Sequence, residues 1–240
     1  NEHVADHVDE GTVRARMHRV RAQQIVLAAG AHERPLVYGN NDLPGCMIAS
    51  AVSTYINRYA VRPGRRLVVC TTNDSGYQAA FDWVRAGGEV PVVCDTRSVV
   101  KGAVIDQAKA LGIEIRCGYG VVNVKGRRHV QGVEIAPLSE DGSSVTGPVR
   151  QISCDTVASS GGFSPVVHLS AHLGHRPIWD EAVIGFTPHP DCGLIAVGSA
   201  AGVHEMSALL EQTTTRVSDA LEVPRSRVPH VEVRDENPPM

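Results

Sequence analysis

The sequence predicts an α/β fold in which a second, smaller domain is inserted into an incomplete first one, both of the dinucleotide-binding type. Apolar strands alternate with amphipathic helices from 65 to 117, as in a βαβαβ unit with a parallel sheet. Two further strands, at 25–29 and 192–198, also end in turns of small residues but have no βαβ unit beside them. These two strands therefore look like the middle and the end of a domain that the 65–117 block interrupts.

The predicted elements follow one another in a consistent order. After the strand at 25–29, a connection rich in Pro, Gly and Asn leads to a helix at 49–59 that has apolar residues on one face. A last pair of strands, at 152–162 and 192–202, leads into a helix at 204–221. The interrupting block contributes strands at 67–70, 90–94 and 113–117, helices at 76–86 and 99–111, and a hairpin of 121–124 with 130–136.

This order divides the chain into four parts. We expect the middle of the first domain at 1–60, the second domain with its hairpin at 61–150, and the return to the first domain at 151–221. The Pro-rich, polar segment at 222–240 is expected to be a poorly ordered tail.

The composition of the chain excludes several classes of function. A chain of 240 residues with a net charge of −3 can bury a sizeable core, and its scattered charges leave no basic patch for nucleic acid. The longest apolar stretches are too short and too rich in Gly and Ala to span a bilayer. The first residues are charged, which excludes a secretory signal peptide, and the missing initiator Met suggests an excised fragment. The six cysteines form no CxxC pair, so we expect reduced, structural thiols in a cytoplasmic protein.

The stretch TTNDSGYQAA at 71–80 stands where a dinucleotide-binding domain places its G-x-G-x-x-G turn. The three glycine positions correspond to Thr71, Asn73 and Gly76, so only the third glycine, which lets the helix pack against the strand, remains. The Asn73 side chain would lie where phosphate oxygens normally lie, and Asp74 would add a negative charge there or cap the helix. We expect a Rossmann frame that binds no dinucleotide tightly.

Asp95 ends the second strand of the block, where an acidic residue often hydrogen-bonds an adenosine ribose. That role would favour NAD over NADP, but Arg97 could instead pair with a phosphate. Asp95 could also simply cap the next helix. Because the glycine turn is degraded, capping is the stronger interpretation.

The first domain is the better candidate for a cofactor. Its AAGA turn, which contains Ala29 and Gly30, resembles the A-T-G turn of two-dinucleotide-binding flavoproteins, where small residues let the backbone approach the cofactor. The terminal strand of such proteins usually ends in Gly-Asp, and here Ser199 follows Gly198 at the Asp position. Loss of the carboxylate argues against a conventional FAD. A buried strand end that binds nothing is the alternative.

Five segments resemble, in this order, the α subunit of heterotetrameric sarcosine oxidase: LAAGAHERPLVYGNNDLPG, NDSGYQAA, CDTVASSGGFSPVVHL, WDEAVIGFTP and GLIAVGSAAG. The larger subunits of opine oxidases, hydrogen cyanide synthase and dye-linked proline dehydrogenases share parts of this region, so sarcosine, an opine, glycine and proline stay open as substrates. The resemblance implies the Rossmann-like fold of two-dinucleotide-binding flavoproteins. It also implies a hetero-oligomer with β, γ and δ subunits.

The resemblance further implies cofactors and a chemistry. In the full enzyme, FAD of the β subunit oxidises the secondary amine, electrons pass through FMN at the α/β interface to oxygen, and a tetrahydrofolate domain outside this region captures the one-carbon unit. The α chain holds NAD in its FAD-like domain and supplies no catalytic residue here, so the isolated chain is expected to be inactive. The residues expected at the nucleotide are Ala29, Gly30, Gly198, Ser199, Ala200, His204 and Met206, with Asn73, Gly76 and Asp95 as weaker candidates.

Two other functions stay open. The chain could be an NADH-dependent flavin reductase, although the missing CxxC and the degraded glycine turn count against an FAD-dependent oxidoreductase of that kind. It could also be a nonenzymatic assembly module with a purely structural nucleotide. His168, His172 and His175 have helical spacing, but only the distant His189 and Cys192 could join them, so we expect surface or packing histidines and no metal.

Overall fold

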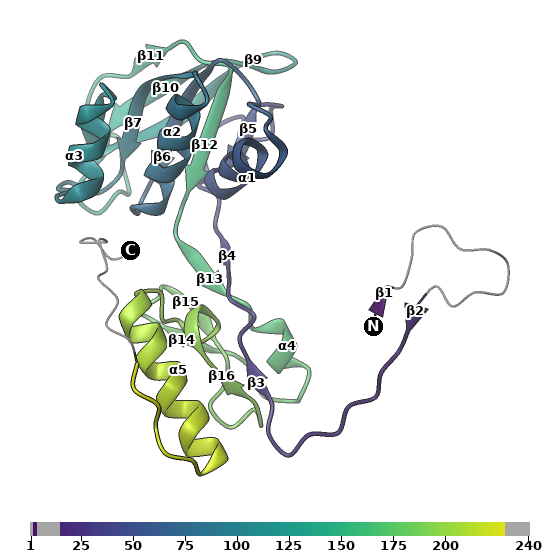
Figure 1. Ribbon diagram of the computed structural model, residues 1–240. Coiled ribbons are helices and arrows are strands. Elements are labelled where there is room, and N and C mark those ends of the chain that lie inside the picture. The colour runs from purple at the N-terminus through teal and green to yellow at the C-terminus, as the bar shows by residue number, and fades with distance from the viewer. Residues whose placement is uncertain (1, 4–14, 229–240) are drawn as a thin grey trace, which may run out of the picture.

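The computed structural model describes residues 2–3 and 15–228, and most of them form two lobes joined by a pair of strands (Figure 1). We call residues 36–160 the inserted lobe, and the segments 24–30 and 166–222 the flanking lobe. Between them, β4 (Ala31–Glu33) and β13 (Phe163–Pro165) pair antiparallel and form the connector. The two segments through which the chain enters and leaves the inserted lobe therefore lie side by side.

The centre of the inserted lobe is a five-stranded parallel sheet with the strand order β5-β12-β6-β7-β8. Its middle strand, β6 (Arg66–Thr71), lies between β12 (Thr156–Ser160) and β7 (Glu89–Asp95). β5 (Cys46–Ile48) and β8 (Ile115–Cys117) form the edges. Continuous apolar runs in β6 and β7 suit strands that are covered on both faces.

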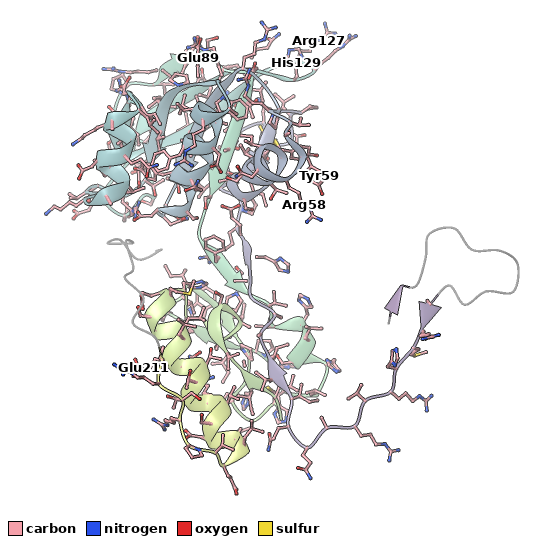
Figure 2. All side chains as sticks on the ribbon, in the orientation of Figure 1. Arg58, Tyr59, Glu89, Arg127, His129 and Glu211 are labelled. Carbon is pink, nitrogen blue, oxygen red and sulfur yellow. The ribbon has the colours of Figure 1, made fainter. Side chains whose placement is uncertain are left out.

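Helices cover one face of this sheet. α1 (Ala49–Tyr59), α2 (Ser75–Arg85) and α3 (Ala103–Ala110) share an apolar cluster with Leu67 and Val69 of β6. Both side chains are fully buried, and burying one such side chain contributes roughly 1.5–3 kcal/mol. On the outer side of α1, Arg58 and Tyr59 project into solvent (Figure 2).

A smaller antiparallel sheet covers the other face. It consists of β9 (Tyr119–Gly126), β10 (Val130–Pro137) and β11 (Arg150–Ile152), which pack against Val68 and Cys70 of β6. Because successive side chains of a strand point to opposite faces, neighbouring residues of β6 belong to two different cores.

The flanking lobe is built from short strands and one long helix. β3 (Val26–Leu27) and β16 (Ile195–Ala196) pair in parallel, separately from the five-stranded sheet, which confirms the sequence prediction. After β16 the chain forms the 3₁₀ turn η1 (Gly198–Ala201) and then α5 (Met206–Leu221), which runs along the side of this lobe (Figure 1). The remaining elements are the short helix α4 (His168–Ala171) and the hairpin of β14 (Ile178–Asp180) with β15 (Gly185–Thr187).

Near the start of the chain, β1 (Glu2–His3) pairs antiparallel with β2 (Ala15–Arg16). The prediction of a tail at 222–240 falls largely outside the described residues. No helix within residues 2–3 and 15–228 combines the length and the hydropathy that a membrane crossing needs.

Two segments differ from the sequence prediction. β12 does not pair with the strand at 192–202, because it adds in register to β6 within the five-stranded sheet. The pairings of β5 and β12 therefore extend the inserted lobe on both sides of the expected 61–150 segment. The helix expected at 99–111 begins only at Ala103, since Gly102 before it has a φ of 90° that no helical residue adopts.

Candidate functional site

The turn between β6 and α2 is closed by its own side chains. Asn73 Nδ2 donates to Ser160 Oγ over 3.0 Å, and Asn73 Oδ1 accepts from the backbone N–H of Ser75 at 3.0 Å. Thr71 Oγ1 accepts from the Asn73 N–H at 3.1 Å and donates to the Asn73 carbonyl at 2.7 Å. The Asn73 amide oxygen thus takes a donor at the helix N-terminus that a phosphate would otherwise use.

Gly76 has the packing role that the sequence assigns to it. A Cβ on Gly76 would overlap Oγ1 and Cβ of Thr71, so α2 approaches β6 closely only because residue 76 lacks a side chain. The one surviving glycine of the turn therefore serves the contact between helix and strand.

A buried ion-pair network lies beside this turn. Arg97 Nη2 lies 2.8 Å from Asp95 Oδ2 and 2.8 Å from Asp74 Oδ1, and the Tyr77 hydroxyl donates to Asp95 Oδ2 at 2.9 Å. Burial alone would lower the pKa of Arg97, but the hydrogen bonds to Asp95 and then Asp74 raise it above its ordinary value. Arg97 Nη1 has no hydrogen-bond partner among the described residues, yet two carboxylates balance the charge of this side chain.

Two capping predictions are wrong. Asp95 does not cap the next helix, because α3 begins at Ala103 and Asp95 is fully buried against Arg97. Asp74 forms no side-chain cap on α2, because its carboxylate pairs with Arg97 and Asn73 accepts the helix amide. The structure therefore brings Asn73, Gly76 and Asp95 together, but as parts of a packed turn.

In the flanking lobe, the two turns expected at a nucleotide lie at one edge. β3 and β16 run parallel, so the turn that follows each strand emerges at the same end of the pair. Gly30 has a φ of 75° and Gly198 a φ of 63°, in the left-handed region that favours glycine. A Cβ on Gly30 would meet no atom within 4 Å, so the backbone of this turn borders open space.

The other predicted residues of this lobe are distributed around these two turns. Ala29 precedes Gly30, and Ser199 follows Gly198 in η1. Ala200 is fully buried, which makes it a packing residue, whereas Met206 begins α5 and is 49% exposed.

Side chains already use some backbone donors near these turns. Gln212 Oε1 accepts from the Gly198 N–H at 3.1 Å. The Glu205 carboxylate accepts from the N–H groups of Ser207 at 2.9 Å and Ala208 at 2.6 Å, which caps α5 and lowers the pKa of Glu205. A fixed negative charge at the N-terminus of α5 opposes a phosphate at the same place.

The side chains of His204 and Arg34 lie beside the connector. The rings of His204 and Phe163 have centroids 5.8 Å apart. Arg34 Nη1 donates to the carbonyl of Ile184. Burial lowers the pKa of His204, and the positive charge of Arg34 lowers it further.

Two buried polar atoms, Nε of Arg34 and Oγ1 of Thr213 in α5, lack a hydrogen-bond partner within the described residues. Among the ion pairs of the described residues, none joins a carboxylate to Arg34 or His204. A partly buried cation without a carboxylate and a buried hydroxyl without a partner both fit a ligand that carries phosphate and hydroxyl groups.

The histidines and cysteines form ring contacts and core packing. His168 stacks on His32 with ring centroids 6.1 Å apart, and the rings of His175 and His189 lie 5.2 Å apart. In the part of the chain that the structure describes, no cluster of His, Cys, Asp or Glu could hold a metal ion. Burial raises the pKa of the Cys70 thiol to about 11, as expected for an unreactive core thiol.

Sequence reasoning missed Ser160, Glu205, Gln212 and Arg34. Ser160 reaches Asn73 from a distant strand, and Gln212 reaches Gly198 from the second turn of α5. Glu is an uncommon N-cap residue, so Glu205 gave no capping signal. For Arg34 the only available signal was a basic residue shortly after the AAGA turn.

Comparison with known proteins supports the fold and the resemblance. Residues 2–177 match the family described as Pyridine nucleotide-disulphide oxidoreductase. Sarcosine oxidase subunit alpha from one Corynebacterium strain is 35% identical over 232 residues, which cover 89% of this chain and 24% of that protein. The same subunit from a second Corynebacterium strain is 38% identical over 181 residues, 75% of this chain and 18% of that protein. The predicted resemblance to sarcosine oxidase α subunits is therefore confirmed.

A solved structure supports the same architecture. Thioredoxin reductase from T. acidophilum superimposes with a TM-score of 0.59 at 17% sequence identity, over 83% of this chain and 66% of that chain. The predicted Rossmann-like flavoprotein fold is thus confirmed. The chain spans only about a quarter, or less, of the length of the two sarcosine oxidase subunits.

Proposed function

Because the chain belongs to the pyridine nucleotide-disulphide oxidoreductase family, we propose that it forms the nucleotide-binding part of a sarcosine-oxidase-like α subunit. The whole cytoplasmic enzyme would oxidise the CH–NH group of sarcosine and pass the electrons through FAD and FMN to oxygen. This chain binds NAD in the flanking lobe and serves as a scaffold for the β, γ and δ subunits. The flavins and the tetrahydrofolate site lie elsewhere in the complex.

One observation supports the nucleotide assignment most strongly: the turns at Gly30 and Gly198 lie at one edge of the β3–β16 pair. At Gly30 the missing side chain leaves the backbone open to a ligand, whereas at Gly198 it makes room for Leu209. The hydroxyl of Ser199 stands where a carboxylate would bind an FAD, and the helix-opening residues His204 and Met206 complete the predicted lining. When bound, NAD would supply two phosphate charges and heteroaromatic rings as a structural ligand.

The inserted lobe supports the scaffold role. Its strand-to-helix turn is filled by Asn73, and its cation Arg97 is balanced by Asp74 and Asp95. A dinucleotide would have to displace these contacts, so this lobe contributes a rigid core to the α subunit.

The nucleotide content of the natural full-length protein, purified with its partner subunits, tests the proposal. After acid denaturation, chromatography and mass spectrometry should find about one NAD for each α chain. FAD released from the α chain, or no nucleotide at all, would contradict the assignment. Bleaching of the bound flavin by added NADH would instead support the flavin reductase function.

A further inference from the structure

We infer that the guanidinium of Arg34 binds the pyrophosphate of the dinucleotide, an inference that rests on the proposed NAD site in the flanking lobe. Arg34 follows the Gly30 turn by four residues and lies at the start of the connection into the inserted lobe.

The N-terminus of α5, in the flanking lobe, is a poor place for a phosphate. In dinucleotide-binding folds a helix N-terminus usually binds the pyrophosphate. At α5, however, the Glu205 carboxylate already accepts from the N–H groups of Ser207 and Ala208. A pyrophosphate beside the Glu205 carboxylate would meet like charge, so α5 does not supply its positive partner.

Arg34 has the unbalanced charge that such a ligand requires. Its side chain is partly buried, Nη1 donates to the Ile184 carbonyl, and Nε is buried without a partner among the described residues. The Ile184 carbonyl fixes the guanidinium but does not neutralise it. A partly buried cation is stabilised by an anion, and the guanidinium fork matches phosphate oxygens in two parallel hydrogen bonds.

The surroundings of Arg34 agree with this role. Burial lowers the pKa of His204, and the nearby charge of Arg34 lowers it further. His204 is therefore favoured in its neutral form, and together with the Phe163 ring it forms an uncharged wall near the guanidinium.

Two other arginines, Arg216 of α5 and Arg225 after it, are less suited to phosphate. Arg216 is exposed and donates to the Ala196 carbonyl at 2.7 Å, and Arg225 pairs with Asp219 at 3.1 Å. Neither carries a buried nitrogen that lacks a partner within the described chain. Arg225 is thus a matched control that already has a carboxylate partner.

The experiment is calorimetric titration of the natural full-length protein, freed of nucleotide, with NAD, ADP-ribose and adenosine at two salt concentrations. Arg34→Gln should weaken NAD and ADP-ribose about tenfold or more, and should reduce the salt dependence of both, because a charge-assisted contact to phosphate is lost. Adenosine, which has no phosphate, should bind wild type and variant alike. Arg225→Gln should match wild type with all three ligands.

The outcomes separate the inference from the proposed function. If wild type binds NAD and Arg34→Gln binds it equally well with the same salt dependence, the pyrophosphate lies elsewhere and the inference fails while the NAD site stands. If wild type binds neither NAD nor ADP-ribose, both fail. If Arg34→Gln does not fold, Arg34→Lys decides: it should keep the salt dependence but bind about threefold more weakly, and unchanged affinity would overturn the role of the guanidinium fork.

Discussion

The β6–α2 turn of the inserted lobe and the β16–η1 turn of the flanking lobe both follow a parallel strand of a dinucleotide-binding-type lobe, yet the charges near them are arranged differently. At the first turn, Arg97 lies between two carboxylates and Asn73 fills the helix N-terminus. Near the second turn, Arg34 has no carboxylate partner among the described residues, and Thr213 Oγ1 has no hydrogen-bond partner there. The charged and polar side chains of the first turn have partners within the protein, whereas near the second turn some polar groups have none among the described residues.

The difference shows how a binding turn can become a structural one. Gly76 keeps the geometry that lets α2 pack on β6, while substitutions at the other two glycine positions introduce side chains that replace the ligand's contacts. The fold is retained because helix packing and phosphate binding depend on different positions of the same motif.

The largest expected effect concerns the ion-pair network of the inserted lobe. Arg97→Gln leaves Asp74 and the fully buried Asp95 without their cation, which should lower the free energy of unfolding by about 3–5 kcal/mol. Urea denaturation followed by circular dichroism measures the loss. Arg58→Gln, on the exposed side of α1 (Figure 2), should change stability by less than about 1 kcal/mol. A loss at Arg97 no larger than at Arg58 would mean that the network is not structural.

The next effect tests the surviving glycine. Gly76→Ala places a Cβ against Thr71, so α2 must shift away from β6 at a cost of about 1–3 kcal/mol. The same denaturation assay applies. Ser75→Ala, at the exposed neighbouring position, is the control and should cost less than about 1 kcal/mol. Equal effects at both positions would refute the packing role of Gly76.

A smaller effect is the pH dependence of stability that His204 of the flanking lobe produces. Above the ordinary His pKa of 6.5, His204 is neutral in both the folded and the unfolded protein. As the pH falls below 6.5, the unfolded chain takes up the proton first, because burial and Arg34 lower the pKa in the folded state. Stability should therefore fall more steeply between pH 7 and pH 5 for wild type than for His204→Gln. His129→Gln, an exposed histidine of the inserted lobe (Figure 2), should keep the steep profile.

The last prediction is that changes in the β6–α2 turn have no effect on NAD affinity. Exchanging Asn73 and Asp74 together for Gly removes the side chains that close the β6–α2 turn, but NAD affinity of the natural full-length protein should not change. Calorimetry on the double variant checks this. A tenfold loss, about 1.4 kcal/mol, would show that these residues contact the dinucleotide.

Local patterns predicted most of the inserted lobe. The helix at 49–59 has the predicted bounds, and β6 and β7 extend the predicted strands by one residue at each end. Their apolar runs and helical periodicity are decided by neighbours in the sequence. β12 was misassigned because a parallel strand finds its partner through long-range packing, which periodicity does not report.

In the candidate site, only the positions of the backbone turns were predictable from the sequence. Small residues at Gly30 and Gly198 marked the turns, since positive φ angles leave a signature in residue type. The pairing of Asp74 with Arg97 and the contact of Arg34 with Ile184 were not predictable, because these contacts form only once distant segments meet.

Hydrogen exchange of the natural full-length protein, with and without NAD, tests the central claim most directly. NAD should slow exchange at the amides of 26–34 and 195–207 and leave 71–77 unchanged, because the β6–α2 turn is already filled by Asn73. Protection of 71–77 without protection of 195–207 would place the nucleotide in the inserted lobe and contradict the account.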